Sequence, residues 1–365
     1  MANCISLTTL RCDIFCRVID NYGDAGVCWR LARQLALEHG WQVRLWIDDP
    51  APLALLAPDH ASGPVTACRW PTDFPAVTAD ATADVVVEAF ACHLPPAYIA
   101  AMAQRTRVPV WLNLDYLSAE DWVGDCHGLA SPHPQLPLAK YFFFPGFDAQ
   151  SGGLLRERDY DPRRQAFDAD AFRAEFALPP QTANTLTVSL FSYPGAPTAR
   201  LFRALAAARQ PTLLLRPGSG ERAFTEGNLS VRPLPFLPQI RYDELLWTCD
   251  LNFVRGEDSF VRAQWAGKPF VWQIYPQAEN VHRMKLDAFL DRYAKVGAGD
   301  TASNTAMQAL HDFWHAWNGE GVIDWNHFGA ALPELTPLAQ GWSEHLSQRP
   351  DLATNLVQFC LERLK

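Results

Sequence analysis

Residues 14–47 read IFCRVIDNYGDAGVCWRLARQLALEHGWQVRLWI, and the order of their apolar residues decides the fold. Residues 14–19 form a short apolar run that leads into a turn with two aspartates and two glycines. Apolar residues then recur at helical spacing from Val27 to Gly40, a typical helix-ending residue. Residues 41–47 form a second apolar run. Strand, helix and strand in this length predict a right-handed βαβ unit with a parallel sheet.

The composition is that of a folded, mildly acidic protein. The chain has 365 residues, of which 48% are hydrophobic and 19% charged, so we expect two domains. A net charge of −9 argues against a nucleic-acid partner, which usually requires a basic surface. The nine cysteines contain no C-x-x-C pair, and no stretch resembles a secretion signal or a membrane span. These features predict a reduced, cytoplasmic protein that binds neither nucleic acid nor membrane.

Alternating strands and helices continue through two thirds of the chain. Further apolar strands are predicted at 84–91 and 108–114, and the pattern restarts after the Pro- and Thr-rich residues 176–185. Strands at 186–193, 211–217, 250–256 and 268–276 then alternate with helices at 196–208, 241–249 and 259–266. We therefore predict an N-terminal Rossmann-like domain (1–178), a C-terminal Rossmann-like domain (179–334), and helices that pack back on the first domain (335–365).

Ligands of open α/β sheets bind outside the carboxyl ends of the strands, so the loops that follow strands are candidate sites. DNYGDAG (20–26) contains two acids and no lysine, unlike a phosphate-binding loop. Asp24 is interpreted either as the N-cap of a helix that begins at Ala25 or as a second functional acid. Asp20 precedes that helix start, so we favour a catalytic or substrate-orienting carboxylate.

Two stretches of the second half could bind a nucleotide. RGEDS (255–259) offers an arginine and helix-start amides for a diphosphate and a carboxylate for a ribose, although Asp258 or Ser259 could simply be an N-cap. Phe191 and Tyr193 lie on one face of their strand, and Phe236 and Gln239 follow in a proline-rich segment. They could form a base-stacking slot or belong to the ordinary core.

Other motifs are weaker. The acids of DAD (168–170) precede an amphipathic segment and are interpreted as a helix cap, so no metal is assigned. GSGERA (218–223) is a lone match to a dinucleotide-binding pattern. The histidines form no metal or triad motif, and Asp287 is interpreted as a solvated helix-face acid.

Four of these stretches resemble a known family. CRVIDNYGDAGVCWRLARQL and FVRGEDSFVRAQWAGKPFVWQIYPQ, with SLFSYPG and LPFLPQ between them, are similar to the elongation factor P arginine rhamnosyltransferases, bacterial enzymes of the GT-B class. The resemblance implies two Rossmann-like doubly wound domains that face an interdomain cleft. It also implies transfer of L-rhamnose from dTDP-β-L-rhamnose to an arginine of elongation factor P, with inversion, which activates that factor. No metal and no cofactor other than the donor substrate is implied.

The resemblance also implies roles for individual residues. Asp20 would be the general base, with Asp24 beside it and Glu257 as a further catalytic residue. The acceptor side would include Asn21, Tyr22 and Gly23. The thymine would be bound by Phe191, Tyr193, Phe236 and Gln239, and the ribose and diphosphate by Arg255, Gly256, Glu257, Asp258 and Ser259.

Two alternatives stay open at this point. The first is another GT-B enzyme with a different donor or acceptor, which would share the aromatic slot but need no acidic acceptor site. The second is a non-catalytic module that binds a nucleotide or elongation factor P. Asp20 argues against the second, because pure binding has little use for a carboxylate pair facing a phosphate site.

Overall fold

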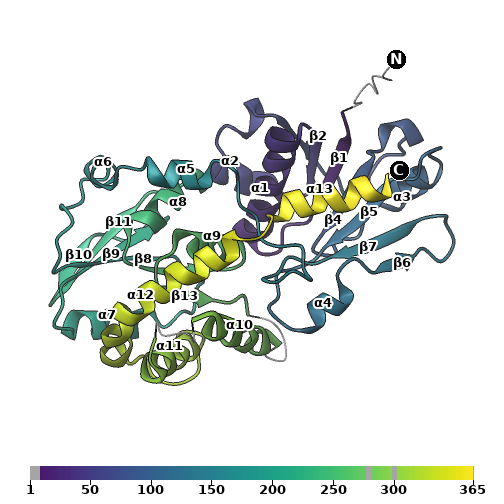
Figure 1. Ribbon diagram of the computed structural model, residues 1–365. Coiled ribbons are helices and arrows are strands. Elements are labelled where there is room, and N and C mark those ends of the chain that lie inside the picture. The colour runs from purple at the N-terminus through teal and green to yellow at the C-terminus, as the bar shows by residue number, and fades with distance from the viewer. Residues whose placement is uncertain (1–8, 277–280, 298–301, 365) are drawn as a thin grey trace, which may run out of the picture. The chain divides into compact units, whose positions relative to one another are not determined.

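The computed structural model describes residues 9–276, 281–297 and 302–364, which form two compact units (Figure 1). Unit 1 comprises the described residues up to 157 together with 350–364. Unit 2 comprises the described residues of 158–349. Each unit contains one largely parallel sheet with helices, which confirms the predicted α/β class.

The sheet of unit 1 has the order β3-β2-β1-β4-β5-β7-β6. The chain forms β1 in the interior of the sheet, adds strands on one side, and then crosses to β4 on the other side of β1. Pairing is parallel except between β6 and β7. The bounds are β1 Arg11–Cys16, β2 Gln42–Ile47, β3 Val65–Arg69, β4 Val85–Ala89, β5 Val110–Leu114, β6 Ala130–Pro132 and β7 Ala139–Phe143.

Helices cover this sheet because its strands are apolar on both faces. Helix α1 packs on β1 and β2 and contacts α2 and α13. A cluster that includes Phe15, Trp70, Tyr98 and Trp111 forms a second core, to which α3 contributes. The bounds are α1 Asn21–His39, α2 Ala51–Leu56, α3 Pro96–Ala103, α4 Trp122–Cys126 and α13 Leu352–Arg363, with 3₁₀ helices at His60–Ser62 and Ala79–Ala81.

The sheet of unit 2 repeats this logic, with the order β10-β11-β9-β8-β12-β13. Its first strand, β8, again lies inside the sheet, and only β10 runs antiparallel to its neighbour. The bounds are β8 Leu186–Leu190, β9 Thr212–Pro217, β10 Phe224–Glu226, β11 Leu229–Leu234, β12 Leu251–Arg255 and β13 Phe270–Gln273.

Helices flank both faces of this second sheet, with α7 and α8 on opposite sides (Figure 1). Trp314, Trp317 and Trp342 are almost fully buried among them. Asp168 is the N-cap of α6 and accepts a hydrogen bond from the Ala171 N–H (3.0 Å), which confirms its predicted capping role. The bounds are α5 Tyr160–Gln165, α6 Ala169–Glu175, α7 Thr198–Ala207, α8 Gln239–Thr248, α9 Asp258–Ala266, α10 Val281–Gly297, α11 Asn304–Trp317 and α12 Trp325–Ser347.

Both unit boundaries differ from the predicted positions at 178 and 335. Residues 158–178 belong to unit 2 because α5 and α6 pack there: the Trp247 Nε1–H donates to the Tyr160 hydroxyl (2.8 Å) and Arg164 donates to the Trp265 carbonyl (2.8 Å). Helix α12 runs through 335 without a break, so only the residues from 350 onward pack in unit 1.

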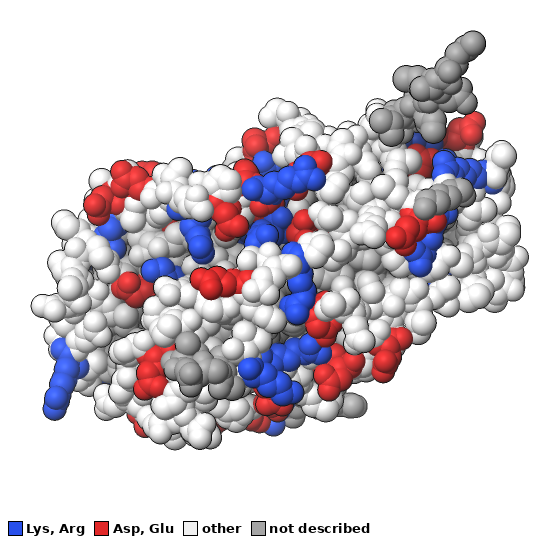
Figure 2. All heavy atoms as spheres, in the orientation of Figure 1, with Lys and Arg blue, Asp and Glu red and all other residues white. Residues whose placement is uncertain are grey.

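Charged side chains are mixed over the surface. On the face in Figure 2, Lys and Arg side chains alternate with Asp and Glu. None of the helices within the described ranges has both the length and the apolar character needed to span a bilayer.

A buried ion pair joins three helices of unit 2. Arg262 on α9 is fully buried, and its Nε and Nη2 donate to the two carboxylate oxygens of Asp243 on α8 (2.9 and 2.7 Å). The guanidinium carbon lies 4.3 Å from the ring centroid of Tyr160 on α5. This pair therefore helps to set the position of α9, which begins at the loop RGEDS.

We expect Arg262→Met to lower the free energy of unfolding by about 3–5 kcal/mol, because it leaves the Asp243 carboxylate buried without its main partner. Urea denaturation followed by circular dichroism measures the change. The double variant R262M/D243L removes the unpaired charge and should recover part of the loss. A double variant as unstable as R262M would contradict this explanation.

Candidate functional site

Each sheet has a topological switch point, where strands added in opposite directions diverge. In unit 1 it lies between β1 and β4, and in unit 2 between β8 and β12. Ligands of open α/β sheets bind at such points, outside the carboxyl ends of the strands. The predicted loops DNYGDAG and RGEDS follow β1 and β12, and FSYPGAP follows β8.

The acidic turn of unit 1 is part of a helix. Helix α1 begins at Asn21, so the prediction that the helix starts after the acidic turn is wrong. Asp20 occupies the N-cap position, and its carbonyl accepts the Gly23 N–H (2.6 Å), but its side chain makes no capping hydrogen bond. Tyr22 is half-buried, and the side chain of Asn21 lies outside the described part of the chain.

The Asp24 side chain binds the backbone just before helix α1. This side chain is buried (2% exposed), and Oδ2 accepts hydrogen bonds from the Ile19 and Asp20 N–H groups, both at 2.8 Å. Burial raises the pKa of Asp24, opposed by these two amides and reinforced by the negative charges of Asp20 and Asp48. Asp24 is therefore not the N-cap; it folds the turn back onto the end of β1.

Gly23 leaves room for the Asp20 carboxylate. A Cβ atom at position 23 would lie 2.5 Å from Asp20 Oδ2, which is closer than non-bonded atoms approach. Any other residue at this position would therefore displace the Asp20 side chain. The glycine and the two acids form one arrangement, in which Asp20 is half-buried at the carboxyl end of β1.

The loop on the other side of this switch point is strained, and nothing in the sequence indicates it. Four non-glycine residues in the described ranges have left-handed backbone conformations, and three of them, Phe90, Ala91 and His93, follow β4 (φ 55°, 51° and 57°). The Phe90 ring stacks on Tyr116, which follows β5 (4.5 Å between centroids). Strain of this kind persists where surrounding structure enforces it, often at ligand sites.

In unit 2, one arginine joins the two loops of the switch point. Arg255 ends β12, and its guanidinium carbon lies 4.2 Å and 4.7 Å from the ring centroids of Phe191 and Tyr193. Its Nη1 donates to the Ser192 carbonyl (3.0 Å). The structure thus brings together three residues that the sequence places in separate motifs.

Helix α9 begins at Asp258, three residues after Arg255. Glu257 occupies the N-cap position, so neither Asp258 nor Ser259 is the N-cap. The Ser259 hydroxyl accepts the Arg255 N–H (3.1 Å) and donates to the Arg255 carbonyl. Gly256 between them is in the left-handed region (φ 62°), which favours glycine. The short turn places the amides of α9 beside Arg255.

The remaining predicted residues come from neighbouring loops. Gln239 begins α8, is buried, and donates to the Asp258 carboxylate (3.1 Å). Phe236 lies beside Gly218, the residue after β9: a Cβ there would be 3.2 Å from its ring. Gln273 was not among the predicted residues, although its Oε1 accepts the Tyr193 N–H (2.7 Å). A polar residue within the apolar run FVWQIYP is the signal that could have identified it.

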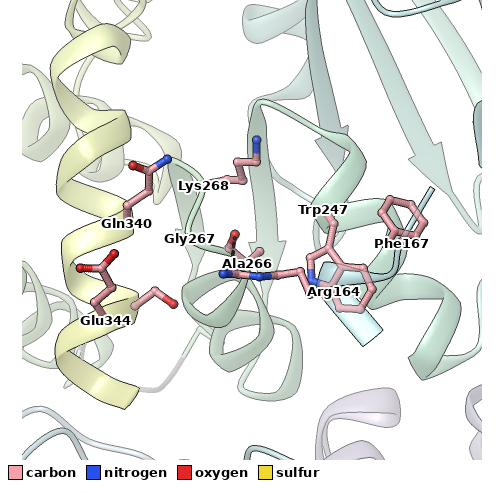
Figure 3. A pocket seen from close by; sticks show the side chains of 9 residues that line it. Arg164, Phe167, Trp247, Ala266, Gly267, Lys268, Gln340 and Glu344 are labelled. Carbon is pink, nitrogen blue, oxygen red and sulfur yellow. Dashed lines mark hydrogen bonds between the residues drawn. The ribbon is translucent and has the colours of Figure 1, made fainter. Parts of the chain in front are cut away.

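A separate cavity of about 370 Å³ lies at the other end of α9 (Figure 3). Ala266, Gly267 and Lys268 line it where α9 ends, with side chains of α5, α8 and α12 around them. Helix α9 has 9 residues and is therefore about 13 Å long. The cavity is thus separated from the switch point, and none of the predicted site residues lines it.

Comparisons with known proteins agree over nearly the whole chain. Residues 12–361 match the family model described as Elongation-Factor P (EF-P) rhamnosyltransferase EarP. A protein-arginine rhamnosyltransferase of Pseudomonas aeruginosa is 46% identical over 377 residues, covering 95% of this chain and 98% of that protein. A protein of the same name from Neisseria meningitidis is 42% identical, covering 97% and 98%.

Solved structures show the same relationship. A structure described as the basis for EarP-mediated arginine glycosylation of translation elongation factor EF-P is 35% identical to this chain, with a TM-score of 0.66 and coverage of 97% and 99%. MurG of Acinetobacter baumannii has a TM-score of 0.54 at 14% identity, a likeness in fold alone. The predicted GT-B class, with two Rossmann-like units, is confirmed.

We expect Asp24→Asn to be more stable than the wild type at neutral pH, by a margin that narrows toward pH 4. The raised pKa means that the folded protein binds the Asp24 proton more tightly than the unfolded chain does. The contribution of this group to stability is therefore present at low pH and is lost as pH rises through the raised pKa. In the variant, the Asn oxygen can still accept both amide protons.

Urea unfolding of both proteins between pH 4 and pH 8 measures this margin. Asp24→Ala is the matched control, and it should be less stable than the wild type by about 1–3 kcal/mol because two part-buried N–H groups lose their charged acceptor. A margin between D24N and the wild type that stays constant with pH would contradict the assignment.

Proposed function

The chain belongs to the family of elongation factor P rhamnosyltransferases, and from this we propose that it transfers L-rhamnose from dTDP-β-L-rhamnose to one arginine of elongation factor P. It is a glycosyltransferase of the GT-B class. The proposal depends on one observation. The switch point of unit 1 carries two carboxylates, and the switch point of unit 2 carries an arginine that contacts two aromatic rings.

Unit 2 is proposed to hold the donor. Arg255 and the first amides of α9 offer positive charge and N–H donors to the diphosphate, and charge on the departing dTDP grows during transfer. Phe191, Tyr193, Phe236 and Gln239 would surround the thymine, with the acids Glu257 and Asp258 on the ribose side. Because Ser259 already bonds the Arg255 backbone, it supports the turn in this scheme. No metal is needed to balance the diphosphate.

Unit 1 is proposed to bind the acceptor arginine. Removing a proton from a guanidinium at pH 7 costs about 9 kcal/mol, so Asp20 cannot deprotonate it in advance. A carboxylate can instead grip the N–H groups, orient one nitrogen toward the anomeric carbon, and accept the proton as the C–N bond forms. Attack opposite the departing dTDP inverts that carbon. Asp24 and Asp20 together supply negative charge for the cation, and Glu257 is retained as a further catalytic residue.

The decisive experiment incubates the protein with purified elongation factor P and dTDP-β-L-rhamnose and analyses the factor by mass spectrometry. We expect a mass increase of one deoxyhexose on a single arginine. UDP-glucose and GDP-mannose in place of the donor should give none. A modified factor only with another nucleotide sugar would assign a different donor, and no modification with any donor would contradict the proposed transfer.

We expect Asp20→Asn to lower kcat by about 10²–10⁴-fold, because the amide cannot accept the proton. The KM for dTDP-rhamnose should be nearly unchanged, since the donor is proposed to bind in unit 2. Initial rates of transfer to elongation factor P measure both constants. Near-normal turnover of D20N would exclude Asp20 as the base.

Gly23→Ala tests the same carboxylate without altering its charge. The added Cβ must displace Asp20 Oδ2, so we expect a loss of kcat in the same direction as D20N while the fold is retained. Gly341→Ala is the matched control, because Gly341 is an exposed residue within α12 and an added Cβ there would meet nothing within 4 Å. Circular dichroism verifies folding, and equal activities of G23A and G341A would show that the position of Asp20 is unimportant.

We expect Arg255→Lys to weaken binding of dTDP at least tenfold, because lysine has no planar fork for two simultaneous hydrogen bonds and cannot stack on both rings. Isothermal titration calorimetry measures the affinity. Arg363, which also stacks on two aromatic rings but in unit 1, provides the control R363K, which should bind dTDP normally. Equal affinities of R255K and the wild type would contradict the donor site.

A further inference from the structure

Two helices of unit 2 bring three metal-ligating side chains together. His311 and His315 stand four residues apart on α11, and Asp287 faces them from α10. The potential ligand atoms of the three residues all lie within 4.8 Å of one another. Two histidines at this spacing lie on one face of a helix, where both rings can reach one ion. The Asp287 side chain and the His311 side chain are about half exposed, so the cluster is open to solvent.

The His315 ring is oriented as in a metal site. Its Nδ1 lies 3.0 Å from Glu320 Oε2, and as donor to that carboxylate it leaves the lone pair on Nε2. Glu320 is itself held, because its N–H donates to the His315 carbonyl (2.8 Å) and its carboxylate pairs with Arg283. A histidine whose second nitrogen is bonded to a carboxylate is the common arrangement around protein-bound zinc.

The contact between His315 and Asp287 fits two ligands better than a simple ion pair. Asp287 Oδ1 lies only 2.8 Å from His315 Nε2, yet this buried nitrogen has no hydrogen-bond partner within the described ranges. The oxygen therefore lies off the direction in which the ring nitrogen would donate. An atom that shares an ion with Nε2 must lie off that direction, because the ion occupies it.

We propose that His311, His315 and Asp287 form a binding site for a divalent transition metal ion such as Zn²⁺. Two imidazoles and one carboxylate are ligands that Zn²⁺ accepts, while Mg²⁺ prefers oxygen ligands only. The isolated histidine and acid motifs gave no indication of this site, because its third ligand comes from another helix. A fourth position is left for water.

Bound metal would tie α10 to α11, helices that lie side by side in Figure 1. The end of α11 already holds the edge of the sheet: the Asn318 side chain donates to the Trp272 carbonyl (2.8 Å) and accepts the Ile274 N–H (3.1 Å). Bound metal would therefore fix α11, the helix whose end contacts the end of β13. The metal site is separate from the residues proposed to bind the donor.

Calorimetric titration of untagged, metal-free, full-length protein with Zn²⁺ tests the proposal. We expect one equivalent to bind, a thermal midpoint that rises with Zn²⁺, and no comparable response to Mg²⁺. Titration with Co²⁺ identifies the ligands, since the chain also has free cysteines. Binding without the intense absorption of Co²⁺–thiolate bonds supports the site, and thiolate absorption would assign the metal to cysteine instead.

Four variants locate the ion. His311→Gln and Asp287→Asn alter half-exposed side chains and should each weaken Zn²⁺ binding at least tenfold. Glu320→Gln should weaken it about 10- to 100-fold through loss of the ring orientation. His327→Gln replaces an exposed histidine on α12 and should bind as the wild type does. Unchanged affinity in H311Q and D287N, or no bound Zn²⁺ in the wild type, would overturn the proposal.

Discussion

The constraint on which both units depend is the handedness of parallel strand connections. In each unit the first strand lies inside the sheet, and the chain extends the sheet first to one side and then to the other. Connections between parallel strands are right-handed as a rule, so reversing the direction moves the connecting helices to the opposite face. At each switch point the loops that follow the two adjacent strands run in opposite directions, so their backbone groups have no neighbouring strand to pair with. The chain supplies these places with charged side chains: Asp20 and Asp24 after β1, and Arg255 at the end of β12. The strand order of each sheet therefore determines where these charged side chains lie.

The two switch points differ in the charged group that the local structure holds in place: the carboxylate of Asp24 in unit 1 and the guanidinium of Arg255, with Glu257 and Asp258 close to it in sequence, in unit 2. In unit 1, backbone amides are directed at Asp24, so that a buried carboxylate is tolerated next to Asp20. In unit 2, the aromatic rings of Phe191 and Tyr193 face the guanidinium of Arg255. The Asp24 carboxylate and the Arg255 guanidinium are thus each stabilised by groups that bear no net charge. A reaction between a cationic acceptor and an anionic donor fits this division.

The sequence predicts the parts of this fold that have strong periodicity. We could predict β1, β2, β4 and β5 because each lies in an apolar run bounded by turn residues. Strand β11 was missed because arginine and proline interrupt it, and its place in the sheet comes from pairing with β9. The start of α1 was missed because it depends on polar contacts, including the Ile19 N–H donating to the Asp24 side chain five residues on, and not on the apolar pattern.

The site residues, too, fall into those that the sequence predicts and those that only the structure reveals. Motifs contiguous in sequence, such as RGEDS, could be identified by composition and by family resemblance. A polar residue in an apolar run could have identified Gln273, but not its contact with Tyr193. The strained loop after β4 and the pairing of Asp287 with two histidines likewise depend on contacts between separate elements, which a single sequence does not reveal. The unit boundaries also required the structure, because the packing of Tyr160 and Trp247, not a change in composition, decides where unit 2 begins.

The last helix has a consequence for the order of folding during synthesis. Helix α13 packs against α1, Leu356 and Cys360 are fully buried in unit 1, and the Gln34 side chain donates to Asp351 (2.8 Å). Unit 1 therefore needs residues that the ribosome adds only after the whole of unit 2, although β1 is made before it. Unit 2 is one continuous segment, and domains fold as units as they emerge. Unit 2 can thus complete its core first, whereas unit 1 completes its core only when α13 has been made.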